Sequence, residues 1–122
     1  NLMHLRSVQD VQSSKTDHGE TIYETVGQSA GGATSHSLAQ IDLAPGCASL
    51  PHFHPVAEET YHILSGAGEI EIDGERAPVK PGDSLSIPPG AVHQIINTGA
   101  NNLIFLAVCV PAWTPDNSVF LD

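Results

Sequence analysis

Short alternating segments separated by glycine and proline are the feature that most constrains the fold of this chain. Glycine or proline recurs about every eight to twelve residues, which is the spacing of an all-β sandwich or barrel. In residues 37–43, SLAQIDL, the apolar residues Ala39, Ile41 and Leu43 alternate with polar ones. Such alternation predicts a strand with one face toward the core. No segment has a helical period of useful length, so the sequence predicts an all-β fold.

Four later segments continue the pattern. The Asp73-Gly74 dipeptide lies between two alternating runs and predicts a hairpin, because it tolerates the positive φ angles of a type I′ turn. Two more strands are predicted over residues 84–87 and 92–96. Residues 102–110, NLIFLAVCV, form a continuous apolar run. Such a run predicts a strand that is buried on both faces.

The length of the chain bounds its organisation. With 122 residues it is about one domain long, and such a domain buries roughly two thirds of its unfolded surface. We expect residues 1–30 to form an N-terminal arm or the first strands and residues 31–111 to form the barrel. Residues 112–122 contain two apolar clusters and a proline, so we expect them to form a tail packed on the barrel.

The charge balance excludes two classes of partner. Four Lys and Arg residues stand against fourteen Asp and Glu residues. Nucleic acids and anionic membranes both require a basic surface, so neither is expected to bind. No apolar run reaches the length of a membrane span or a signal peptide, and we predict a cytoplasmic protein. Cys47 and Cys109 fit no metal or disulfide pattern and are expected to be reduced and buried.

Two histidines and a glutamate stand close together in residues 46–66, GCASLPHFHPVAEETYHILSG. On a strand, His52 and His54 point to the same face. Glu59 begins the next apolar segment, and His93 is the natural fourth partner. Three imidazoles and one carboxylate on an inward face form a metal site. Hydrogen-bonded structural histidines are the alternative, and this interpretation is kept for the other four, which are His4, His18, His36 and His62.

Two sequence motifs carry a family resemblance. Residues 46–66 fit the pattern G-x5-H-x-H-x4-E-x6-G, and residues 82–97 fit G-x5-P-x-G-x2-H-x3-N, at every position. In both motifs the chain resembles the cupins, and in particular the small single-domain microbial cupins. The resemblance implies a jelly-roll β-barrel, also called a double-stranded β-helix. It also implies one divalent metal ion with the ligands His52, His54, Glu59 and His93.

The expected donor set limits the chemistry of that ion. Neutral histidines and one carboxylate leave a divalent ion with a charge of about +1, so it can accept a mono-anionic oxygen ligand. Four protein ligands leave open positions only on an ion that accepts five or six. This favours iron, manganese, nickel or cobalt over closed tetrahedral zinc. The sequence does not identify which of these metals binds.

Strand phase predicts a mostly apolar cavity around the ion. Tyr61 is the one inward residue with a functional hydroxyl near the ligands, so it is the candidate for proton transfer, with simple packing as the alternative. Trp113 either packs on the outside of the barrel or lies over one end as a lid. The residues predicted to line the cavity are Ala39, Ile41, Tyr61, Ile63, Leu85, Ile87 and Ile95.

Three functional hypotheses follow. The first is a metalloenzyme acting on a small oxygen-bearing organic substrate, as a dioxygenase or as an isomerase or lyase working through an enolate. The second is a non-catalytic metal- or ligand-binding module, and the third is a barrel whose metal only stabilises the fold. Sugar-phosphate isomerisation is disfavoured, because a phosphate needs basic groups. The chain has only four, which are Arg6, Lys15, Arg76 and Lys80.

The apolar run near the C-terminus also predicts assembly. A two-sheet sandwich covers only the inner face of residues 103–110. Either the N-terminal segment or a second subunit must cover the outer face. Closed two-fold dimers are the commonest solution, so we predict a homodimer.

Overall fold

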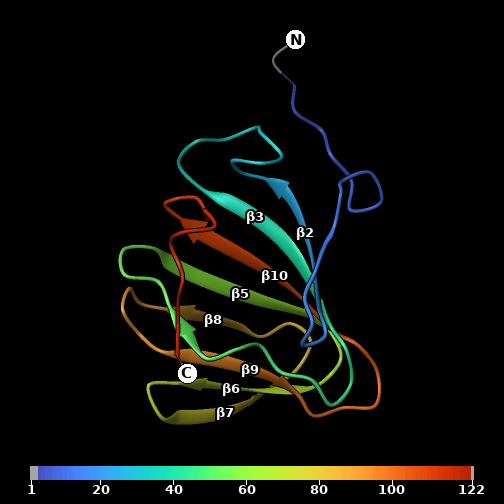
Figure 1. The fold of residues 1–122 in the computed structure, drawn as a ribbon. Coiled ribbons are helices and arrows are strands. Elements are labelled where there is room, and N and C mark those ends of the chain that lie inside the picture. The colour runs from blue at the N-terminus through green and yellow to red at the C-terminus, as the bar shows by residue number, and fades with distance from the viewer. Residues whose placement is uncertain (1–2, 122) are drawn as a thin grey trace.

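A computed structural model describes residues 3–121, which form eleven β-strands and, within that range, no helix. The strands belong to two antiparallel sheets that face each other (Figure 1). The larger sheet contains, in spatial order, β1 (Ser14–Lys15), β2 (Glu20–Val26), β3 (Ser37–Leu43), β10 (Leu103–Val110), β5 (Glu58–Ser65) and β8 (Ser84–Ile87). The smaller contains β11 (Val119–Phe120), β4 (His52–Phe53), β9 (His93–Asn97), β6 (Gly68–Ile72) and β7 (Glu75–Val79). The predicted all-β jelly-roll fold is confirmed.

The hairpin at Asp73-Gly74 also forms as predicted. Asp73 and Gly74 have φ angles of 47° and 86°, and β6 pairs with β7 around them. The Asp73 carboxylate accepts a hydrogen bond of 2.8 Å from the backbone N–H of Val92. Because Val92 precedes His93, this turn helps to fix the start of strand β9.

The core lies where large aliphatic side chains from both sheets meet. Along the paired strands β3 and β10, the inward pairs are Leu43 with Leu103, Ile41 with Phe105, Ala39 with Ala107 and Ser37 with Cys109. The first two pairs have large side chains and the last two have small ones. The Leu43–Leu103 end is therefore filled, and space remains toward the Ser37–Cys109 end. The side chains with no exposed surface are Leu43, Ile63, Ile95, Leu103 and Phe105.

Strand β10 differs from the prediction on its outer face. Its inner residues are buried, but Ile104, Leu106 and Val108 are only half-buried. The polar partners Gln40 and His62 lie on either side of Leu106 in the neighbouring strands. The prediction that both faces of this strand are buried was therefore wrong for the single chain. Polar side chains flank the row of apolar residues on its outer face.

Both ends of the chain join the sheets. The structure places β1 and β2 within the segment of residues 1–30, where they extend the larger sheet beside β3. In the C-terminal segment, β11 pairs with β4, with Phe120 opposite His52. Residues 3–121 contain no helix that is long and apolar enough to cross a membrane.

Candidate metal centre

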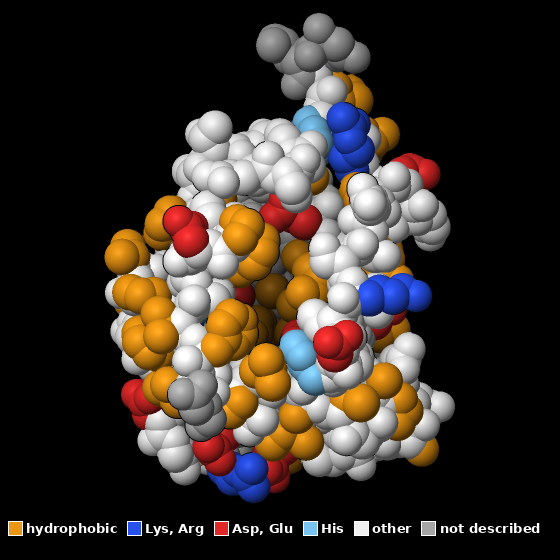
Figure 2. All heavy atoms as spheres, viewed as in Figure 1, with side chains coloured by type: hydrophobic (Ala, Val, Ile, Leu, Met, Phe, Trp, Pro, Cys, Tyr) orange, Lys and Arg blue, Asp and Glu red, His pale blue; other side chains and the backbone are white. Residues whose placement is uncertain are grey.

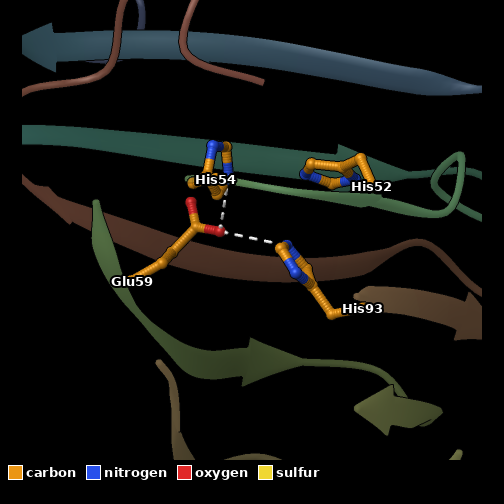
Figure 3. A group of neighbouring side chains, drawn as sticks. All are labelled: His52, His54, Glu59 and His93. Carbon is orange, nitrogen blue, oxygen red and sulfur yellow. Dashed lines mark ion pairs between the residues drawn. The ribbon is translucent and has the colours of Figure 1, made fainter. Parts of the chain in front are cut away.

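Four side chains from three strands and one loop meet at one point inside the barrel. His52 lies on β4, His54 follows that strand, Glu59 lies on β5 and His93 on β9. One ligand atom from each residue lies within 4.8 Å of the other three. Figure 3 shows the carboxylate of Glu59 between the rings of His54 and His93, with His52 alongside. The structure thus brings together the four residues that the sequence motifs suggested.

Three polar atoms that face this point make no hydrogen bond to the protein. Nε2 of His54 and Nε2 of His93 each lie 3.3 Å from Oε1 of Glu59. All three atoms are buried, and none has a hydrogen-bond partner. Burying polar atoms without a partner is costly. A bound cation would satisfy all three at once.

The opposite nitrogen of each ring fixes its tautomer. Each Nδ1 bonds to a backbone carbonyl, which can only accept, so Nδ1 carries the hydrogen. In a neutral ring, Nε2 then keeps its lone pair and points it at the common centre, as a metal ligand must. The three bonds run from His52 to Leu50 (2.8 Å), from His54 to Asn117 (3.1 Å) and from His93 to Ala91 (3.1 Å).

The glutamate is oriented by a cysteine. Cys109 lies opposite Glu59 in the pairing of β10 with β5, and its Sγ lies 3.1 Å from Oε2 of Glu59. Burial, and then the charge of Glu59, raise the pKa of the Cys109 thiol. The thiol therefore keeps its proton and donates a hydrogen bond to Oε2. This contact occupies Oε2 and leaves Oε1 for the centre. Both cysteines are free, as predicted, but Cys47 is only half-buried.

The electrostatics of the cluster concentrate its charge on the contact between His54 and Glu59. Burial, and then the neighbouring His93, lower the pKa of His52 to about 4. Burial disfavours the charged forms of His54 and Glu59, but the contact between the two side chains favours these forms more strongly. The pKa of His54 is therefore raised and that of Glu59 is held well below its usual range. Three imidazoles and one carboxylate fit a divalent transition metal, because nitrogen and oxygen donors of this kind suit such ions.

A cavity of about 380 Å³ connects this cluster with the surface. Figure 2 shows a hollow in this face of the molecule with hydrophobic side chains inside it. Three of the predicted lining residues, Ala39, Ile41 and Tyr61, line it. The other four, Ile63, Leu85, Ile87 and Ile95, pack in or against the hydrophobic core and not along the cavity. They share the inward face, but they lie where large side chains from both sheets interlock.

The N-terminal hairpin supplies a wall that the sequence interpretation missed. The inward residues of β2 are Glu20, Ile22 and Glu24, and all three line the cavity together with His18. Nε2 of His18 lies 2.5 Å from Oε1 of Glu20. The only sequence signal was the spacing of Glu20, Ile22 and Glu24 at every second residue, in a segment with weak overall patterning.

Backbone contacts hold this hairpin in place. Thr16 N–H donates to the carbonyl of Glu20 at 2.9 Å, and Glu20 N–H donates to the hydroxyl of Thr16 at 3.0 Å. Gly19 has a φ of 95° and accepts a 3.0 Å bond from Ala44 N–H. A side chain at Gly19 would collide with Cys47, so glycine lets the hairpin approach the barrel closely.

The cavity carries acidic but no basic residues. None of its lining residues in the described part of the chain is Lys or Arg. Arg76 instead pairs with Glu69 (3.0 Å) and Glu71 (2.6 Å), and Lys80 pairs with Asp83 (3.1 Å). The cavity lining in the described residues therefore offers a phosphate group no Lys or Arg side chain.

Tyr61 and Trp113, for which the sequence suggested roles, both line the cavity. Burial, and then the charges of Glu59 and Glu20, raise the pKa of Tyr61, so its hydroxyl stays protonated. Tyr61 is thus close to both the metal ligands and the β2 wall. Trp113 is 39% exposed, and its backbone N–H donates to the Ser37 hydroxyl at 2.9 Å. Trp113 also lines the cavity, and its role as a lid stays a prediction.

Comparison with known proteins agrees with the donor set and the fold. The model of the cupin domain family matches residues 39–109, which is more than half of the chain. The protein belongs to the cupin family. This cupin is 33% identical over 107 residues to an uncharacterised protein of Methanocaldococcus jannaschii, covering 88% of this chain and 86% of the relative. It is 39% identical over 73 residues to an oxalate-binding protein of Thermotoga maritima, covering 60% of each.

Solved structures of cupin proteins show the same architecture. A predicted oxalate decarboxylase of Thermotoga maritima superposes with a TM-score of 0.79 at 26% identity, covering 88% of this cupin and 98% of that chain. Streptomyces Pac13, a nucleoside dehydratase, superposes with a TM-score of 0.82 at 15% identity, covering 98% and 92%. The second likeness concerns the fold alone.

Proposed function

We propose that this cupin is a metal-dependent enzyme that acts on a small, oxygen-bearing organic substrate, as a dioxygenase or as an isomerase or lyase. One observation carries the proposal. Three buried, unpartnered atoms, Nε2 of His54, Nε2 of His93 and Oε1 of Glu59, converge beside a cavity of about 380 Å³ that His54 and Glu59 line. This volume is at the lower end of the range of about 300–1,000 Å³ for small-molecule sites.

The protein groups divide the work. His52, His54, Glu59 and His93 would hold the ion, and the carbonyls behind the imidazoles keep them oriented. A divalent ion there would supply Lewis acidity and lower the pKa of a bound water or hydroxyl. The protonated hydroxyl of Tyr61 can donate a hydrogen bond to a ligand oxygen in the cavity. The apolar walls exclude water from that oxygen.

The experiment starts from protein stripped of metal and reloaded separately with iron(II), manganese(II), nickel(II), cobalt(II) and zinc(II). Oxygen consumption with a panel of catechols, β-diketones and hydroxy acids tests the dioxygenase class. Exchange of substrate C–H hydrogen with deuterium oxide tests the isomerase and lyase class. A turnover that requires metal and disappears in His54→Ala supports the proposal, and no turnover with any loaded metal contradicts it.

A non-catalytic ligand-binding role is the second candidate. The relative described as an oxalate-binding protein favours it. Saturable ligand binding without turnover would support this role. A protein that unfolds on chelation and binds no exchangeable ligand would favour a metal that only stabilises the fold.

Two features of the whole protein stay proposals. The half-buried outer row of β10 supports a homodimer, which light scattering at micromolar concentration would test. Measuring the protein's distribution between cell fractions would test the proposed cytoplasmic location.

A further inference from the structure

The cavity contains a second polar pair that the metal cluster does not use. His18 and Glu20 line the same cavity as the metal ligands. Their side chains are 26% and 13% exposed and are joined by a 2.5 Å contact. The pair thus lies at the boundary between the interior and solvent, where a ligand entering the cavity would meet it.

Folding of the hairpin does not explain this pair. The turn is closed by Thr16 and by the backbone of Glu20, without either side chain of the pair. Glu24, the other inward carboxylate of β2, is bonded by the backbone N–H groups of Ser29 and Ala30. Among the residues that the structure describes, the carboxylate of Glu20 has no such backbone donors, and His18 is the one hydrogen-bond partner of this carboxylate.

The pair has unused hydrogen-bond acceptors. An ionised Glu20 only accepts, so Nε2 of His18 carries the shared hydrogen, and Nδ1 of a neutral ring is then an acceptor. The carboxylate has about four lone-pair sites, of which His18 uses one. The pair can therefore accept a hydrogen bond from a hydroxyl or N–H group, and it would repel a second carboxylate or a phosphate.

Apolar residues line the cavity together with the two polar sites. In the larger sheet Ile22 lies opposite Ile41 and Ala107 lies opposite Tyr61, and all four residues line the cavity. Tyr61 is close enough to both Glu59 and Glu20 for their charges to act on its hydroxyl. A ligand that reaches from the metal cluster to His18 would therefore lie along apolar side chains.

We propose that His18 and Glu20 form a second ligand anchor, which binds a hydroxyl or N–H group of a molecule whose other end is held by an oxygen at the metal site. The fitting ligands are small, mostly apolar molecules with an oxygen function at one end and a hydrogen-bond donor at the other. Dicarboxylates are rejected. The inference rests on the proposed function, because it requires a metal that binds one end of the ligand.

Binding of defined probes to the cobalt(II)-loaded protein tests the anchor by calorimetry. Benzoate and 2-naphthoate carry one carboxylate for the metal, and 3-hydroxybenzoate, 4-hydroxybenzoate and 6-hydroxy-2-naphthoate add a hydroxyl at three different reaches. A hydrogen bond to a charged group corresponds to about tenfold or more in affinity. We expect at least one hydroxylated probe to bind about tenfold more tightly than its parent. Terephthalate, with a second carboxylate, should bind more weakly than benzoate.

Substitutions then assign the gain to the pair. In His18→Ala and Glu20→Gln the gain from the hydroxyl should disappear, while the affinity for benzoate and the cobalt content stay unchanged. Glu20→Gln should also relieve the penalty on terephthalate. His36→Ala, an exposed histidine outside the cavity, is the matched control and should keep the gain. His18→Asn serves as the second variant if His18→Ala lowers the melting temperature.

The outcomes separate the two proposals. If every hydroxylated probe binds like its parent, or if the gain survives in both variants, the anchor is overturned and the metal site stands. If the variants lose benzoate binding as well, the pair is structural and the anchor is again overturned. If the cobalt-loaded wild type binds none of the carboxylates, the proposed function fails and the anchor fails with it.

Discussion

The cavity has two polar walls that are built in different ways. The first wall is that of the metal cluster, where four ligands converge, each held from behind by a carbonyl or a thiol. Three of them, His52, His54 and Glu59, face the cavity. On the wall formed by β2, His18 and Glu20 bind each other and have few other contacts. Each ligand of the first wall has a second contact that orients it, as a metal site requires. The second has one internal contact and is partly exposed, which leaves its acceptors available to a ligand.

The largest expected effect follows from removing a ligand on the first wall. His54→Ala should weaken zinc binding by more than about 100-fold, because loss of an outer-shell partner alone costs about 10- to 100-fold. The barrel should still fold, since its apolar strands carry the core. The apparent melting temperature should fall only because metal no longer stabilises the native state. A competition titration and a thermal scan check this, and an unfolded variant would instead indicate a structural metal.

Acidification should weaken metal binding in a defined direction. The pKa of His54 is raised by Glu59 despite burial, whereas that of His52 is lowered to about 4. Below the pKa of His54, a proton must leave before a metal can bind, so affinity should fall by about tenfold per pH unit. Zinc titrations between pH 8 and pH 5.5 measure the slope. Constant affinity across this range would show that His54 is not protonated in the metal-free centre.

The C-terminal segment should matter to the first wall through one backbone carbonyl. Truncation after Ala112 removes Asn117, whose carbonyl orients His54, and also removes the pairing of β11 with β4. We expect zinc affinity to fall by about 10- to 100-fold, with a lower melting temperature. Trp113→Ala keeps both contacts and is the control. If Trp113 acts as a lid, this variant loses zinc to a small chelator faster without losing affinity, and an unchanged stripping rate would leave Trp113 a packing residue.

A smaller effect is expected from the thiol behind Glu59. Cys109→Ala removes the donor to Oε2 and should lower metal affinity by several-fold, up to about tenfold. Cys109→Ser keeps a donor and should recover most of the loss. The absorption spectrum of the cobalt-loaded protein reports how Glu59 binds the ion. Equal affinities and spectra for both variants would show that Cys109 only fills space.

The smallest effect on metal binding should come from the second wall. His18→Ala should leave zinc affinity within about twofold of the wild type, because His18 contacts Glu20 and none of the four ligands. The same competition titration measures this. A loss comparable with that of Cys109→Ala would mean that the two walls are coupled and would remove the contrast between them.

Local patterns were enough to predict much of the first wall. The i, i+2 spacing of His52 and His54 places both on one strand face whatever the rest of the fold does. The Asp73-Gly74 turn is likewise a local property of two residues, and it formed as expected. The cavity lining was predicted less well, because strand phase shows that Ile63 and Ile95 point inward but not how far along the barrel they lie.

The sequence by itself determined the strand pattern, the family motifs and the identity of the four candidate ligands, because these depend on residue type and short spacing. Tertiary structure alone decided what stands behind those ligands and what faces them. Asn117 reaches His54 across 63 positions, Cys109 meets Glu59 through the register of β10 with β5, and His18 enters the cavity because β2 pairs with β3. Such contacts are fixed by strand register and chain closure, and a local periodicity carries no information about either.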